Sequence, residues 1–224
     1  ASSRGLTYRS ESARLASPAR WMWLGFELGL GPNADVPLSR WDDSFVPMRL
    51  ADNLREVRLA DGGPLVAAEE QLLPHRIAPE PGDPSNAWWP YALAGLALAG
   101  SILVAGKRRP RLLAALALPF WLLCGLVGVL LLYLWLGTEH WAAWANHNLL
   151  LFDPLCLLLL PGGWALARGR RPGRAFAWIL AAVALLAIGA LGLSWLQIRP
   201  QQDMRWIVLL LPLHLALLAA LRRR

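Results

Sequence analysis

Five long apolar runs fill the second part of the 224-residue chain and constrain its fold more than any other feature. An α-helix rises about 1.5 Å per residue, so roughly 20 apolar residues cross the ~30 Å hydrocarbon core of a bilayer. The last run is the shortest, and the arginines beside it can reach the interface with their long side chains. The pattern predicts an all-α membrane protein, a five-transmembrane-helix bundle with spans at approximately 87–106, 112–137, 147–167, 175–197 and 205–221.

Basic residues gather in three of the segments that join or follow these runs, at 107–111, 168–174 and 222–224. Cytoplasmic loops of membrane proteins carry an excess of lysine and arginine. We therefore expect the three basic segments in the cytoplasm, together with the C-terminus, and the N-terminus and residues 137–148 on the other side. Tryptophans near that outer interface are typical of an aromatic belt: Trp88, Trp89, Trp135, Trp141, Trp144, Trp195 and Trp206.

The formal net charge of +7 arises at the ends of the apolar runs. Residues 1–86 hold 9 Lys+Arg against 12 Asp+Glu, whereas residues 87–224 hold 13 against 3. A basic protein often binds nucleic acid. Here the basic residues are placed as topology signals, so we expect membrane lipids and no nucleic acid among the partners.

The composition divides the chain at the start of the first apolar run. We expect a small, partly irregular extracytoplasmic segment at 1–86 and a five-helix transmembrane domain at 87–224. Within the first segment we expect two short helices at 21–31 and 41–55, and a β-hairpin or loop at 56–66. A stiff proline-rich linker follows at 74–84. Because the chain begins with Ala1, we expect a processed product or a fragment of a longer protein.

Polar side chains in and beside the apolar runs are the candidate functional residues, because a polar group in a bilayer needs a partner. By helical rise, Asp153 and His214 lie about 8–12 Å below the outer interface, where they can face each other. One interpretation is an outward-opening polar pocket that binds a lipid headgroup or transfers protons. The other is a buried Asp–His pair with capping asparagines that fix helix packing. The candidates are Glu139, His140, Asn146, His147, Asn148, Asp153 and His214.

No catalytic nucleophile, cofactor motif or metal-ligand spacing is recognisable in the sequence. His140 and His147 do not match a zinc pattern. Cys124 and Cys156 both lie inside apolar runs, which predicts packing rather than catalysis. We therefore expect neither a metal nor a cofactor, and the catalytic residues are unknown.

Two sets of short motifs resemble bacterial Lnb-type lipoprotein N-acyltransferases. Residues 41–50, with Phe-x-Pro-x-x-Leu, and Gly63-Pro64-Leu65-Val66 resemble the end of the periplasmic domain of that family. Residues 137–140 and 146–150 resemble the outer loop of its five-helix membrane domain, which reads Thr-Asp-His and then Asn-x-Asn-Leu-Leu. Glu139 stands where the family usually has Asp.

The resemblance implies a place and a role for the chain. It implies the bacterial inner membrane, a periplasmic N-terminus, and an upstream periplasmic domain whose Cys–His pair moves an acyl chain onto a lipoprotein. Residues 1–86 contain no cysteine, so we expect the catalytic domain outside this chain. The chain is then a membrane-anchoring, lipid-presenting module. The alternatives are a small proton-coupled transporter and a purely structural anchor.

Overall fold

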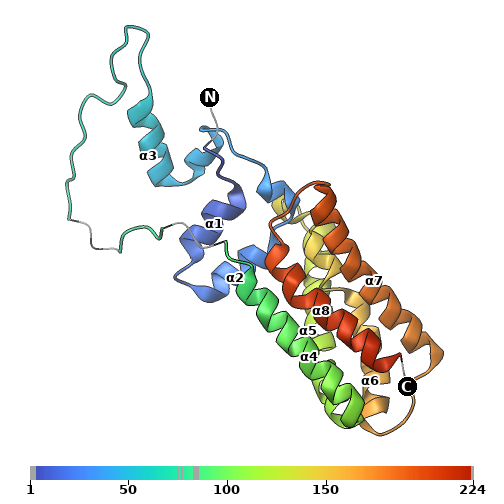
Figure 1. Ribbon diagram of the computed structural model, residues 1–224. Helices are drawn as coiled ribbons and strands as arrows, with labels where there is room; N and C mark the ends of the chain where they lie inside the picture. The colour runs from blue at the N-terminus through green and yellow to red at the C-terminus, as the bar shows by residue number, and fades with distance from the viewer. Residues whose placement is uncertain (1–3, 75, 77, 83–85, 223–224) are drawn as a thin grey trace. The chain divides into compact units, whose positions relative to one another are not determined.

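The computed structural model describes residues 4–74, 76, 78–82 and 86–222 and contains two compact units (Figure 1). One unit comprises residues 1–28 and 34–85, and the other comprises residues 29–33 and 86–224.

The larger unit contains five segments long and apolar enough to cross a membrane. Four of them are continuous helices whose bounds lie within a few residues of those expected. The predicted all-α, five-helix class is therefore confirmed. The helices are α4 (Trp89–Arg108), α5 (Pro110–Leu136), α6 (Leu160–Ala167), α7 (Arg174–Leu196) and α8 (Met204–Leu221).

The third span is not one continuous α-helix. It begins with the 3₁₀ turns η4 (His147–Leu150) and η5 (Pro154–Leu159) and becomes α-helical only in α6. Proline lacks an N–H group and disfavours the helical conformation of the residue before it. Asp153 accordingly has an extended backbone, and its side chain accepts a hydrogen bond from Leu155 N at 2.8 Å.

The helices approach closely where glycine replaces a side chain. α8 packs against α4 and α7, whereas α5 packs against η5 and α6. A Cβ atom on Gly95 of α4 would lie 2.5 Å from the Val208 carbonyl oxygen of α8, and one on Gly128 of α5 would collide with the Phe152 carbonyl oxygen. Small residues at such crossings allow van der Waals packing between transmembrane helices.

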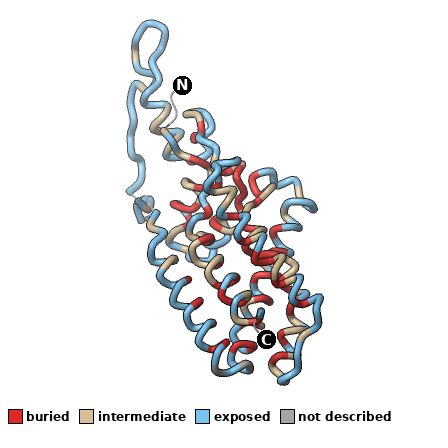
Figure 2. Tube along the Cα trace, turned by 45° about the vertical axis from the view of Figure 1, so that its right-hand side comes forward, coloured by how far each residue is buried: buried red, intermediate tan, exposed pale blue. Residues whose placement is uncertain are grey.

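Large side chains fill the interior of the bundle, and other apolar side chains cover its outside. Trp121, Leu159, Ile207 and Leu217 are buried, and the Trp121 ring meets Phe176 edge-on with centroids 5.6 Å apart. Buried residues gather inside the bundle, while the outer faces of the long helices are exposed (Figure 2). An exposed surface of leucine, valine and tryptophan suits contact with lipid chains.

The smaller unit is built from short helices around a few apolar side chains, including the buried Leu38 and Val46. Pro47 separates a 3₁₀ turn from α3, where the sequence predicted one helix. Arg58 and Pro64 form an isolated β-bridge, and no strand occurs in the described part of the chain. The elements of the smaller unit are α1 (Tyr8–Ala16), α2 (Arg20–Gly29) up to residue 28, η2 (Asp42–Phe45) and α3 (Pro47–Glu56). The 3₁₀ turn η1 (Pro32–Asp35) contains the second boundary between the two units, after Asn33.

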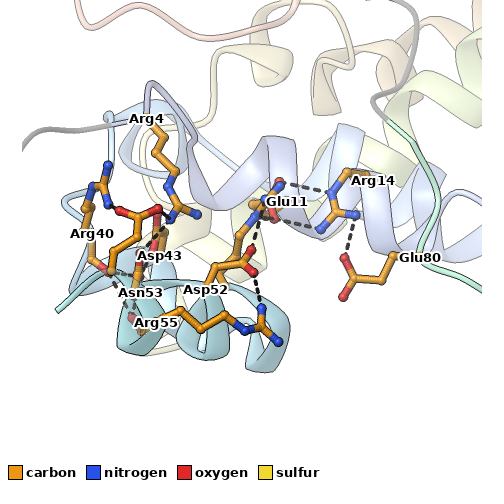
Figure 3. A network of polar contacts seen from close by, with 12 residues as sticks. Arg4, Glu11, Arg14, Arg40, Asp43, Asp52, Asn53, Arg55 and Glu80 are labelled. Atoms are coloured by element: carbon orange, nitrogen blue, oxygen red, sulfur yellow. Dashed lines mark hydrogen bonds and ion pairs between the residues drawn. The ribbon is translucent and has the colours of Figure 1, made fainter. Parts of the chain in front are cut away.

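A network of ion pairs centred on Glu11 joins the elements of the smaller unit (Figure 3). The Glu11 side chain is 1% exposed and accepts hydrogen bonds from Arg14 at 2.9 and 3.1 Å and from Arg49 at 3.1 Å. Burial raises the pKa of Glu11, but the hydrogen bonds from Arg14 and Arg49 outweigh it and lower the pKa overall. Arg14 also bonds Glu80 and the Pro81 carbonyl oxygen, both at 2.9 Å.

Candidate functional site

Asn146 fixes the point where the third span enters the bundle. Ala145, just before it, has a left-handed backbone with φ of 53°, which turns the chain out of the preceding loop. The Asn146 side-chain oxygen then accepts a hydrogen bond from Asn148 N at 2.9 Å and caps η4. Asparagine is a preferred cap because its short side chain reaches the backbone N–H two residues ahead. Asn146 and Asn148 are 2% and 0% exposed, so this cap is buried.

Gln201 binds the same turn from the loop between α7 and α8. Its Nε2 atom donates to the Asn146 side-chain oxygen at 3.0 Å, and its Oε1 atom accepts from His147 N at 2.9 Å. The Gln201 amide thereby bonds an acceptor of Asn146 and a donor of His147 at the same time. The loop reaches this position through left-handed backbone turns at Gln197 and Arg199, with φ of 53° and 48°.

Asp203 adds a carboxylate to the cluster. It is 1% exposed, and its carbonyl oxygen accepts from Trp206 N and Ile207 N, which starts α8. One carboxylate oxygen lies 3.9 Å from Nδ1 of His147. We refer to Asn146, His147, Asn148, Gln201 and Asp203 as the amide cluster, because the Gln201 amide bonds both Asn146 and His147 N across the two segments.

Asp153 and His214 lie deeper in the bundle and bond separate backbone groups. His214 is 2% exposed, and its Nε2 atom is 2.9 Å from the Leu151 carbonyl oxygen. The Phe120 ring covers the imidazole with a centroid distance of 5.0 Å. The Asp153 carboxylate caps η5 through Leu155 N. His214 thus bonds the backbone two residues before Asp153. Among the described residues, the side chains of Asp153 and His214 are not hydrogen-bonded to each other.

Glu139 and His140 stand apart from the buried cluster, because both are exposed. The loop that carries them is fixed by Thr138, whose hydroxyl donates to the Leu134 carbonyl oxygen at 2.7 Å and accepts from His140 N at 3.2 Å. Trp144 closes the loop by donating from Nε1 to the Thr138 carbonyl oxygen at 3.1 Å. This part of the site is a surface, not a buried pocket.

Residues 29–33 belong to the same unit and pack against this loop. Gly31 N donates to the Ala142 carbonyl oxygen and Asn33 Nδ2 donates to the Trp141 carbonyl oxygen, both at 2.7 Å. Arg199 donates to the Asn33 side-chain oxygen at 2.7 Å. A Cβ atom at Gly31 would collide with the Trp144 carbonyl oxygen, so glycine is needed for this close approach.

The sequence prediction missed Asn33, Gln201 and Asp203. A signal was present for two of them, because Gln201 and Asp203 are polar residues in the short segment between the last two apolar runs. Asn33 carried no such signal, since it lies more than a hundred residues before its partner Trp141.

The amide side chains of the cluster are suited to hydrogen bonding. Amide groups donate and accept but do not activate a nucleophile. Both cysteines, Cys124 and Cys156, are fully buried inside the bundle. No group of three His, Cys, Asp or Glu side chains in the described part of the chain is close enough together to hold a metal ion.

The family model of the Lnb transmembrane domain matches residues 85–224. The chain belongs to the Lnb transmembrane domain family. The matched residues include the five spans, the outer loop and the whole of 197–203, so the Lnb domain contains every residue of the amide cluster. Searches of curated proteins and of solved structures gave no match to the chain.

Proposed function

We propose that this chain is the membrane-anchoring module of a lipoprotein N-acyltransferase-like protein of the bacterial inner membrane, and that its outer loop presents membrane lipid. The partners in this proposal are membrane lipids, an upstream periplasmic domain of the same protein and a lipoprotein substrate. The N-terminus is periplasmic and the C-terminus cytoplasmic. The chemistry takes place in the upstream domain.

The match of the Lnb transmembrane domain to all five spans is the observation that carries the anchoring role. Charge placement supports the orientation, because the basic segments lie at one end of the spans and residues 137–148 at the other.

The outer loop supports the lipid-presenting role because it combines a fixed base with an exposed polar edge. Gln201 and Asn146 hold the base through hydrogen bonds of 2.9–3.0 Å. Glu139 and His140 are exposed, beside Trp141, whose side chain is 48% exposed. Tryptophan favours the headgroup region of a bilayer, where polar neighbours can bond lipid headgroups. A rigid loop of this kind holds a bound lipid in one orientation.

Complementation of cells that lack the full-length gene tests this role. The gene carries Glu139→Gln with His140→Ala, or the control Gln197→Ala, whose side chain is exposed on the neighbouring loop. Mass spectrometry of a lipoprotein N-terminal peptide measures N-acylation, and immunoblotting measures membrane abundance. We expect N-acylation to fall about tenfold in the double variant, the effect of losing roughly 1.4 kcal/mol of substrate contact. The control retains wild-type N-acylation.

An anchor exchange separates presentation from anchoring alone. If an unrelated membrane anchor in place of residues 86–224 supports full N-acylation, the lipid-presenting role is wrong and only anchoring remains. Asp153→Asn and His214→Ala test whether the outer polar pocket takes part in the reaction, because each variant removes a group that titrates. Unchanged N-acylation and normal abundance in both variants would leave these two residues a packing role.

Cysteine labelling tests the orientation independently of activity. Single cysteines placed at Glu139 or His140 should react with a membrane-impermeant maleimide added to the periplasmic side. A cysteine at Arg170, in a basic loop, should react only after the inner membrane is opened. The reverse pattern would overturn the proposed threading.

A further inference from the structure

A cavity of about 420 Å³ lies at the basic end of the bundle, between α6, α7 and α8. This volume falls in the range of roughly 300–1,000 Å³ that is usual for ligand pockets. Its wall is mainly apolar and includes Leu166, Phe176, Leu180 and Leu221. These four side chains are buried, so the wall belongs to the packed interior of the bundle.

Two arginines complete the lining of this cavity. Arg171 comes from the loop before α7 and Arg222 from the residue that follows α8. Both are exposed, and neither guanidinium has a hydrogen-bond or ion-pair partner among the residues that the structure describes. Arg168, in the same loop, differs because it stacks over the Trp164 ring at 4.8 Å.

Within residues 87–222, no aspartate or glutamate side chain lies at this end of the bundle. The acidic residues of 87–224 are Glu139, Asp153 and Asp203, all at or near the end where α8 begins. Arg222 follows the other end of α8, 18 residues along the helix, which is roughly 27 Å away. The two arginines therefore have no acidic side chain of the bundle beside them, and their charge is open to a ligand.

The start of α7 adds a third feature that favours an anion. Gly173 lines the cavity and is the N-cap residue of this 23-residue helix. Because glycine has no side chain, it does not cap the first N–H groups of the helix. The first N–H groups of a helix lack partners within the helix, and its dipole favours negative charge there. Phosphate groups commonly bind at such helix ends.

The cavity also reaches the outside of the bundle. Ala177 and Trp178 line it and are exposed, Trp178 to 76%. A tryptophan near the end of a transmembrane helix is typical of the lipid–water interface. A ligand with an apolar chain and a negatively charged head therefore matches both the apolar wall and the arginines of the cavity.

We infer that this cavity binds one anionic phospholipid, with part of an acyl chain against the apolar wall and the phosphate between Arg171, Arg222 and the start of α7. Basic pockets between transmembrane helices select anionic headgroups in this way. The bound lipid braces α6, α7 and α8 against one another. This site is separate from the outer loop and does not depend on the proposed function.

Lipid binding to the purified full chain tests the inference. Native mass spectrometry counts lipid adducts in a neutral detergent while phosphatidylglycerol or phosphatidylcholine is titrated, and thermal unfolding is followed with the same lipids or with inorganic phosphate. We expect one phosphatidylglycerol adduct and a raised Tm, a weaker effect of phosphatidylcholine, and none of phosphate. Arg171→Gln with Arg222→Gln should weaken phosphatidylglycerol binding about thirtyfold, since each of the two basic groups near a lipid surface contributes about 1 kcal/mol.

A matched double variant controls for the loss of positive charge. Arg170→Gln with Arg174→Gln removes the same amount of charge at the start of α7, but neither residue lines the cavity. It should keep the phosphatidylglycerol adduct, whereas Ala181→Phe, which fills the cavity, should weaken both lipids. Equal losses in the two double variants would overturn the inference, as would stabilisation by phosphate equal to that by phosphatidylglycerol.

Discussion

The two units bury polar side chains with different chemistry. In the smaller unit, Glu11 is buried with full charges around it, the guanidinium groups of Arg14 and Arg49. In the larger unit, the neutral amides of Asn146 and Gln201 make the hydrogen bonds between the third span and the α7–α8 loop, with the Asp203 carboxylate 3.9 Å from His147 beside them. A buried charge carries a desolvation cost of several kcal/mol, whereas an amide needs only its hydrogen bonds.

The difference follows from what surrounds each polar group. The Glu11 network is partly open to water, since Arg49 is 24% and Glu80 37% exposed in their side chains. The amide cluster lies at the entrance of an apolar bundle, where an unpaired charge is expensive. The comparison predicts that removal of one partner costs more in the charged network than in the amide cluster.

The largest expected effect is that of Glu11→Ala. The substitution leaves Arg14 and Arg49 without their shared carboxylate, and breaking a buried ion pair in this way costs about 3–5 kcal/mol. Hydrogen exchange of peptides covering α1, read by mass spectrometry on the intact protein, should show protection reduced about a hundredfold or more.

The matched control is Glu69→Ala, which removes the exposed partner of Arg55. Exposed ion pairs contribute little to stability, so protection of α1 should be unchanged. If Glu69→Ala and Glu11→Ala had equal effects, the central role of Glu11 would be wrong.

Gln201→Ala should have the next largest effect. It leaves His147 N without its acceptor at a part-buried position and deprives Asn146 of one donor, a loss of about 1–3 kcal/mol. Thermal unfolding in detergent should show a lowered Tm, and hydrogen exchange should increase in residues 146–152. Gln197→Ala removes the same group from an exposed position and should leave both measurements unchanged. A Tm for Gln201→Ala equal to that of the wild type would show that the amide contacts contribute nothing to stability.

The five-helix architecture could be predicted from the sequence because length, apolarity and charge act locally along the chain. Asn146 and Asn148 were also predicted as candidates, because polar residues beside an apolar run are conspicuous. Gln201 was not, since its role depends on a contact across 55 residues. Burial of Glu11 was missed for the same reason, because its partner Arg49 lies 38 residues away.

The relation between Asp153 and His214 shows a second limit of sequence analysis. Their depths were counted with the α-helical rise of about 1.5 Å per residue, but η4 is a 3₁₀ turn, for which the rise is about 2.0 Å. The extended backbone at Asp153 changes the direction of its side chain again. Asp153 and His214 therefore bond separate backbone groups because of the local backbone conformation, which the spacing of apolar residues in the sequence does not indicate.

The smallest effect should be the acid response of the smaller unit. The pKa of folded Glu11 lies below its ordinary value of 4.5 because the hydrogen bonds from Arg14 and Arg49 outweigh the effect of burial. Its contribution to stability is thus complete above pH 4.5 and is lost as the pH falls through the folded pKa. Protection of α1, corrected for intrinsic exchange rates, should decline below pH 4.5 in the wild type and much less in Glu11→Gln. The hydrogen bonds of Gln201 to Asn146 and to His147 N join neutral groups. Glu11→Gln should therefore leave the pH dependence of protection in residues 146–152 unchanged, and an equal change in both regions would remove the proposed distinction between them.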